Sequence, residues 1–265
     1  SPMSRGLGDV YKRQVELNPK VRHKLNSIPL DKKNNVYITY LPDATENDIL
    51  ETVDFVSKQE LTPITHLPAR TMKDLDHVSD FLKELRNRTD SKKILVIGGG
   101  GNQNGSVSSS LEILECGLLK DNDFEEIGIA GHPEGSPDID QNTVNEFLNK
   151  KYELSKDKDL NLELVTQFFF NAEPFIKWCK FLDNSNIKLP VRVGFPGPAS
   201  FKTLLNFGIM SGVGNSLSFL KKNSSKVTDL LTKTSNDEMF IELANFSKEQ
   251  SSFKNFHCFP FGGFE

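Results

Sequence analysis

The stretch KKILVIGGGGNQNGS, residues 92–106, decides between two α/β folds. An apolar run leads into four glycines, and Gly98, Gly100 and Gly105 form a loose G-x-G-x-x-x-x-G pattern. A dinucleotide-binding fold also needs an acidic residue about 20 positions further on, at the end of the next strand, to hold the ribose. The acidic residues that follow lie inside a helical pattern or before the next strand: Glu112, Glu115, Asp121 and Asp123. The pattern therefore disfavours a dehydrogenase of the dinucleotide-binding type.

Short strand-like segments alternate with helical patterns along the rest of the chain. Most of these segments are apolar without strict alternation, as expected for parallel strands that are covered on both faces. Eight strands are predicted, at 15–19, 35–42, 62–69, 92–99, 125–133, 162–170, 189–197 and 253–261. Eight strands with intervening helices and no long linker favour a closed (β/α)8 (TIM) barrel, with a doubly wound open sheet as the rival architecture.

Helical signals support this alternation. Segments 108–119 and 172–183 each place apolar residues at helical spacing, which predicts one helix in each. Thr45 is the expected N-cap of a helix over 45–59, with Asp48 in the capping-box position. The long connection over 211–252 is predicted to hold two or three helices.

Both ends of the chain are unusual. Residues 1–14 lack an initiating Met and any apolar periodicity, so we expect a non-native or disordered leader there. This leaves 15–265 as a single barrel domain. The chain stops just after a strand, where another helix would normally follow, and the barrel is therefore expected to be truncated at its C-terminal helix.

Composition narrows the functional classes. Hydrophobic residues make up 37% and charged residues 26% of the 265 residues, which allows a sizeable core. A net charge of −4 without a Lys/Arg cluster argues against nucleic acid as a partner. No apolar run approaches the ~20 residues needed to span a bilayer, and no signal-peptide core is present. Three widely spaced cysteines favour neither a disulfide framework nor a zinc site, so we expect a cytoplasmic protein.

Polar residues gather at the predicted C-terminal ends of the strands, where barrel enzymes carry their chemistry. Glu16 lies between two apolar residues, and an inward carboxylate there needs a partner or serves as a proton donor. His132 and Glu134 are candidates for an acid–base pair, a metal pair or ordinary loop residues. The absence of H-x-H and H-E-x-x-H patterns disfavours a metal. Gln167, flanked by three phenylalanines, offers a donor and an acceptor suited to the edge of a heteroaromatic ring.

Four segments, in this order, give the chain a family resemblance: THLPAR (65–70), IAGHPEGSPD (129–138), LVTQFFFNAEPF (164–175) and FHCFPFGG (256–263). They resemble the methylenetetrahydrofolate reductases, over nearly the whole chain from Val15, and T-Q-F-F-F is the most specific part. The resemblance implies an FAD-containing barrel that interconverts 5,10-methylene- and 5-methyltetrahydrofolate in one-carbon metabolism and methionine biosynthesis. It implies NAD(P)H as electron donor and a folate as small-molecule partner. The sequence leaves a homo-oligomer open.

The resemblance also implies roles for individual residues. Glu16 matches the general acid that protonates the folate. Gln167 matches the residue that recognises the pterin, and Phe207 the ring that lies over substrate or nicotinamide. The matches for flavin contacts are Thr39, Tyr40, His66, His132 (in place of a Tyr) and, for the FAD phosphates, Lys151.

The chain departs from the family pattern at three places. Gly98-Gly99-Gly100 stands where the family carries Arg-Gly-Asp, while Thr203 replaces a Gln and Gly263 an Arg. Loss of a carboxylate near the flavin raises its reduction potential and removes a folate contact. The departures suggest a divergent branch, leave open the direction from methyl- to methylenetetrahydrofolate, and give an alternative: a redox-inactive accessory barrel that binds folate or flavin.

Overall fold

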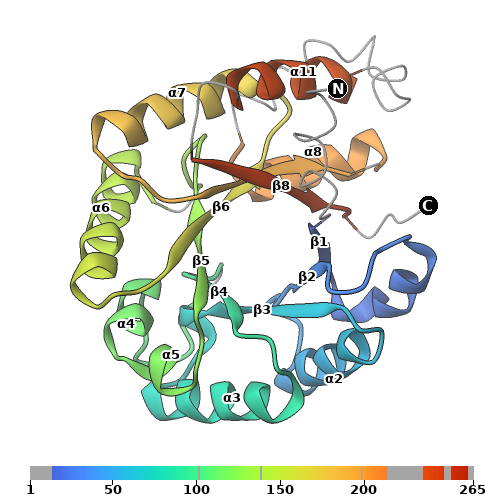
Figure 1. Cartoon of the computed structure of the whole chain (residues 1–265), viewed down its shortest axis with the longest axis vertical. Coiled ribbons are helices and arrows are strands. Elements are labelled where there is room, and N and C mark those ends of the chain that lie inside the picture. The colour runs from blue at the N-terminus through green and yellow to red at the C-terminus, as the bar shows by residue number, and fades with distance from the viewer. Residues whose placement is uncertain are drawn as a thin grey trace, which may run out of the picture. The chain divides into compact units, whose positions relative to one another are not determined.

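Eight parallel strands close a barrel in the order in which they occur along the chain. A computed structural model describes residues 14–100, 102–137, 139–197, 199–213, 235–247 and 252–261. The strands are β1 (Gln14–Leu17), β2 (Asn35–Ile38), β3 (Thr62–Pro68), β4 (Lys93–Ile97), β5 (Glu126–Gly131), β6 (Leu162–Phe168), β7 (Val191–Pro196) and β8 (Phe253–Phe259). Each predicted strand is present and alternates with helices (Figure 1), so the (β/α)8 fold is confirmed and the open sheet is wrong.

The strands end earlier than their apolar patterns predict. The pattern over 35–42 becomes a strand only to Ile38, and that over 125–133 only to Gly131. Beyond these points the chain leaves the sheet to form the loops that carry Thr39, Tyr40, His132 and Glu134. At the other end, β1 begins at the buried Gln14, one residue inside the predicted leader, and residues 1–13 lie outside the described part.

Two helices match their sequence signals closely. α2 (Glu46–Ser57) begins with the predicted capping box: the Thr45 Oγ1 accepts from the Asp48 amide at 3.2 Å, and the Thr45 amide donates to the Asp48 carboxylate at 2.9 Å. α7 (Ala172–Asn184) buries its apolar stripe, including Trp178 and Cys179. Burial raises the pKa of the Cys179 thiol to about 12, which keeps it protonated and unreactive.

The helix expected over 108–119 is instead two short helices. α4 (Ser110–Glu115) and α5 (Leu118–Asp121) are separated at Gly117, whose φ of 84° is left-handed. The apolar spacing continues through this point, but a left-handed residue ends a helix. The prediction of one continuous helix is therefore wrong.

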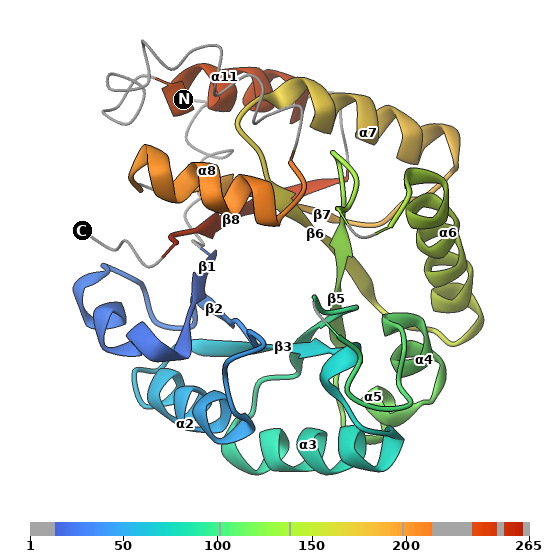
Figure 2. The ribbon, with the colours of Figure 1, turned by 180° about the vertical axis from the view of Figure 1, so that it is seen from behind.

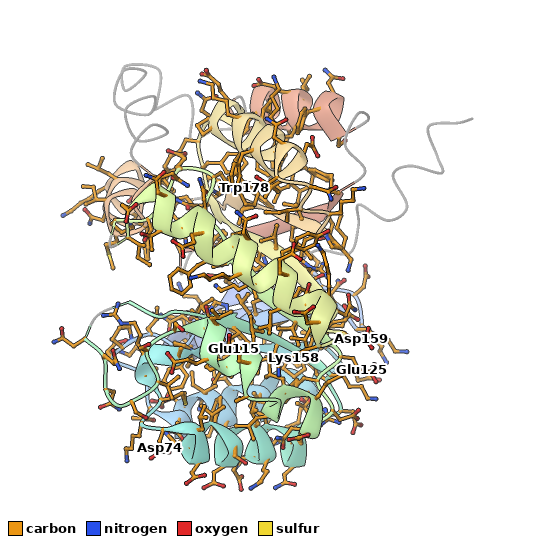
Figure 3. All side chains as sticks on the ribbon, turned by 90° about the vertical axis from the view of Figure 1, so that its left-hand side faces the viewer. Asp74, Glu115, Glu125, Lys158, Asp159 and Trp178 are labelled. Atoms are coloured by element: carbon orange, nitrogen blue, oxygen red, sulfur yellow. The ribbon has the colours of Figure 1, made fainter. Side chains whose placement is uncertain are left out.

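The chain divides into two compact units. Unit 1 comprises 14–130 and 150–163, and contains α2, α3 (Leu75–Arg88), α4, α5 and the 3-10 helices Pro19–Ser27 and Ala69–Thr71. Within it, α2 packs on β2 and β3 and lies beside α3 (Figure 1). Figure 3 shows Asp74, the N-cap of α3, and Glu125, which precedes β5, on opposite sides of this unit. Asp74 thus marks the side of the carboxyl ends of the strands.

Unit 2 comprises 131–149 and 164–261, and contains α7, α8 (Phe201–Met210) and α11 (Ser235–Ser247). β7 and β8 pair in parallel, with Gly194 opposite His257. α11 contacts α7 (Figure 2), and Phe207 of α8 contacts Phe261, two residues past the end of β8. α6 (Gln141–Asp157) contributes to both units. Of the helices predicted over 211–252, α11 is present, and 214–234 lie outside the described residues. None of the helices in the described part of the chain is long and apolar enough to cross a membrane.

Candidate active site

Glu16 and His66 form a carboxyl–imidazole pair in unit 1. Glu16 of β1 lies opposite Tyr37 of β2 in the sheet, and Tyr37 lies opposite Ile64 of β3, two residues before His66. Side chains alternate along a strand, so this register puts the three polar groups on one face of the sheet. The Glu16 Oε1 is 3.6 Å from the His66 Nε2, with side-chain exposures of 16% and 9%. The structure thus provides the partner that an inward Glu16 requires.

Two further residues, Tyr37 and Thr39, lie near this pair. The sequence did not predict Tyr37 as a site residue. The Tyr37 ring is buried and stands edge-on to His66, with centroids 6.3 Å apart. Thr39, predicted as a flavin contact, donates its hydroxyl proton to the Leu17 carbonyl at 3.3 Å. It therefore joins β2 to β1 one residue past Glu16, with its oxygen still able to accept. The two-residue spacing of Tyr37 and Thr39 was the signal that could have identified Tyr37.

Tyr40 lies with the helices. Its ring packs on Phe81 of α3 at 6.0 Å between centroids. Burial, assisted by the negative charge of Glu46, raises the Tyr40 pKa to about 12, so its hydroxyl stays protonated. The Tyr40 ring thus contacts α3, whereas the Tyr37 ring contacts His66. A flavin contact for Tyr40 stays a prediction, and its observed role is packing.

The glycine-rich loop after β4 divides into structural and open positions. A Cβ on Gly105 would lie 2.0 Å from the Lys73 carbonyl oxygen, and Gly99 has a φ of 86° and lies against Pro68. The fold itself therefore requires these two glycines. A Cβ on Gly98 or Gly100 would meet nothing within 4 Å. At these two positions the bare backbone faces open space.

Hydrogen bonds hold this loop to the segment after β3. The Arg70 amide donates to the Gly98 carbonyl at 3.0 Å, and the Asn104 amide donates to the Arg70 carbonyl at 2.8 Å. The Asn104 side chain donates to the Thr71 carbonyl at 3.1 Å, and the Ser106 hydroxyl to Lys73 at 3.1 Å. The open glycines thus lie on a fixed loop, as a preformed binding surface requires.

In unit 2, Gln167 has a fixed amide. Its Nε2 donates to the Ser211 carbonyl at 3.3 Å, and the Ser211 amide donates to the Phe207 carbonyl at 2.9 Å. The Gln167 Oε1 is buried without a hydrogen-bond partner among the described residues. The contact to a carbonyl orients the amide and leaves a buried acceptor, which favours a ligand with an N–H donor. Gln167 and Phe207, predicted as substrate contacts, are thus linked through Ser211.

The loop after β5 carries His132 and rests on the end of α8. The Gly135 amide donates to the His132 carbonyl at 3.1 Å, with Gly135 at a φ of 88°. A Cβ on Gly212, which has a φ of 70°, would lie 2.6 Å from Pro137 Cδ. The position of this loop therefore depends on a glycine at the end of α8. His257, also predicted at the barrel mouth, is fully buried beneath Phe259, with ring centroids 4.8 Å apart.

Lys151 lies on the buried face of α6. At helical spacing it continues a stripe of three buried residues: Val144, Leu148 and Ser155. Burial lowers the pKa of its ammonium to about 8, and it makes no ion pair with any residue the structure describes. An anionic partner would stabilise the charged form of this ammonium. The predicted phosphate contact is consistent with that need and stays a prediction.

Across the described ranges, no group of three or more His, Cys, Asp or Glu side chains is placed to hold a metal ion. For His132 and Glu134, the roles of acid–base pair, metal pair or loop residues all stay predictions.

Comparison with known proteins assigns the chain to no family. No family model matches the sequence. Among solved structures, the chain is similar to a β-mannanase from Streptomyces thermolilacinus, determined with mannohexaose. The identity is 18%, the match covers 74% of each chain, and the TM-score is 0.46. A likeness at this level carries no argument about activity.

Proposed function

We propose that this protein is a cytoplasmic, FAD-dependent oxidoreductase that interconverts 5,10-methylenetetrahydrofolate and 5-methyltetrahydrofolate. The observation that carries the proposal is the buried Glu16–His66 pair, with the Glu16 Oε1 3.6 Å from the His66 Nε2. Reduction of the folate requires a proton, and a carboxyl with an imidazole beside it can hold and release one. The resemblance in sequence supplies the substrate.

The residues of unit 1 fit a flavin. Gly98 and Gly100 leave backbone bare toward open space, so a flat ring system can approach without meeting a Cβ. Thr39, His66 and these glycines would hold the ring system, and Lys151 the phosphates. When bound, FAD supplies reversible transfer of a hydride, with NAD(P)H as the proposed donor in the reductive direction.

The chain itself supplies proton transfer and orientation. In the reductive direction, Glu16 holds a proton on its carboxyl group and gives it to a folate nitrogen. The carboxylate that remains lies 3.6 Å from the His66 Nε2, and the Tyr37 ring stands edge-on to the imidazole. In unit 2, the Gln167 Oε1 is an acceptor suited to an N–H at the edge of a heteroaromatic ring, while the Ser211 carbonyl holds the Gln167 Nε2.

The test uses Glu16→Gln and a matched control. Glu46 and His77 form a second carboxyl–imidazole pair in unit 1, on the surface, so Glu46→Gln removes an equivalent charge away from Glu16. We expect all three proteins to be yellow with bound FAD. Wild type and Glu46→Gln should reoxidise reduced flavin with methylenetetrahydrofolate, and Glu16→Gln should lose at least ~100-fold in rate.

Two outcomes would contradict the proposal. A colourless protein that takes up no added FAD would exclude flavin chemistry. A yellow wild type whose reduced flavin is not reoxidised by methylenetetrahydrofolate, although folate binds, would instead support the redox-inactive binding barrel.

A further inference from the structure

Phe261, directly after β8, combines a strained backbone with a dense set of ring contacts. Its φ of 51° lies in the left-handed region, which is unfavourable for a bulky side chain. Its ring stacks on Phe207 of α8, with centroids 4.6 Å apart and planes at 32°, and meets Phe168 edge-on at 4.8 Å. Because ring contacts hold this strained backbone in place, a ligand that replaces those contacts can release Phe261.

The residues around Phe207 suit the binding of a ligand. Within the described part of unit 2, Phe261 is the one aromatic ring in contact with Phe207, and Phe207 is partly exposed. The Phe207 carbonyl is bonded to Ser211, which in turn holds the amide of Gln167. Gln167 of β6 and Phe207 of α8 are thus linked through Ser211, and Phe261 packs on the Phe207 ring.

We infer that Phe261 is an aromatic gate, which stacks on Phe207 in the free protein and is displaced by a planar heteroaromatic ring that carries an N–H donor at its edge. The incoming ring takes the place of Phe261 on Phe207, and its N–H donates to the Gln167 Oε1. Release of Phe261 relieves the left-handed backbone, which offsets part of the lost stacking. The gate therefore favours rings that donate a hydrogen bond to the Gln167 Oε1 over rings that only stack on Phe207. Its ligand in turnover is the pterin of the folate, and that assignment alone rests on the proposed function.

The first experiment measures the cost of opening the gate. Folic acid is titrated into the full chain and into Phe261→Ala, with Phe170→Ala as control, because Phe170 contacts Phe168 and has no ring contact with Phe207 or Phe261. An aromatic pair of ordinary strength predicts affinity about two- to tenfold tighter for Phe261→Ala, and unchanged affinity for Phe170→Ala. Unchanged or weaker binding by Phe261→Ala would overturn the gate.

The second experiment observes the ring itself. 4-Fluorophenylalanine at position 261 reports its environment by fluorine NMR, and Phe207→Ala, or Phe207→Leu if the first variant folds poorly, marks the signal of the released ring. Folic acid and lumichrome, a flavin-like ring with N–H donors, are added separately. Movement of the wild-type signal to the released position with either probe supports the gate. Movement with lumichrome alone keeps the gate and removes the folate assignment. No movement with either probe overturns the gate, and the Glu16-dependent reaction then decides the proposed function separately.

Discussion

Replacement of Lys151 by Met should stabilise the protein at neutral pH. The side chain lies on the buried stripe of α6, and its pKa is lowered from 10.5 to about 8 by burial. Met keeps the length of the side chain and removes the charge. At about 1.36 kcal/mol for each pKa unit, a lowering of about 2.5 corresponds to an unfavourable contribution of about 3 kcal/mol at pH 7. Lys151→Met should therefore raise the free energy of unfolding by up to about 3 kcal/mol.

The pH dependence gives this prediction a distinctive signature. Between pH 8 and 10.5 the unfolded chain keeps the Lys151 proton while the folded protein has lost it, so wild-type stability rises with pH in this window. Below pH 8 both states are protonated and the full penalty applies, and above pH 10.5 the penalty is gone. The advantage of Lys151→Met should thus be constant below pH 8 and vanish by about pH 10.5.

Urea denaturation from pH 6 to 10.5 measures this difference. Lys158→Met is the control, because Lys158 is exposed just past the end of α6 (Figure 3) and its loss should change stability by less than about 0.5 kcal/mol. An effect of Lys151→Met equal to that of the control, or one independent of pH, would refute the reasoning. If Lys151 also holds the FAD phosphates, the stabilised variant should bind FAD more weakly.

Three glycines give further predictions. Gly98→Ala should leave stability unchanged, or raise it by up to about 1 kcal/mol, because its Cβ meets open space; its FAD affinity, followed by fluorescence titration, should fall if flavin lies against this backbone. Gly105→Ala should lower the melting temperature, because the new Cβ would meet the Lys73 carbonyl at 2.0 Å. Gly212→Ala should cost at least about 1–2 kcal/mol in urea denaturation, since a left-handed φ and contact with Pro137 both oppose it. Wild-type stability in either of the last two would contradict the packing described for that loop.

The fold was predictable because its signals are local. Apolar runs, helical stripes and the Thr45 capping box depend on residues within a few positions of one another, and they identified all eight strands of the barrel. The split between α4 and α5 was missed, because the apolar spacing runs on through Gly117 and its left-handed backbone leaves no mark in that spacing.

The sequence offers candidate residues for a site but does not show how they are arranged. Glu16 and His66 are 50 positions apart, and their contact depends on the register of β1, β2 and β3, which backbone hydrogen bonds between strands determine. Thr39 and Tyr40 follow the end of β2. Beyond the end of a strand, alternation no longer tells which way a side chain points, so the sequence could not show that these two residues have different neighbours.

The sequence by itself determined the barrel, the identity of its polar candidates and the family that they resemble. Tertiary structure alone decided which glycines are forced by packing and which are open, and that Phe261 covers Phe207. Composition and spacing specify what a segment prefers, whereas close approach between distant segments follows from how the whole barrel packs. The glycines after β4 show both effects: their number is a property of the sequence, but only the neighbouring loop at Lys73 makes Gly105 obligatory, whereas a Cβ on Gly98 would meet nothing within 4 Å.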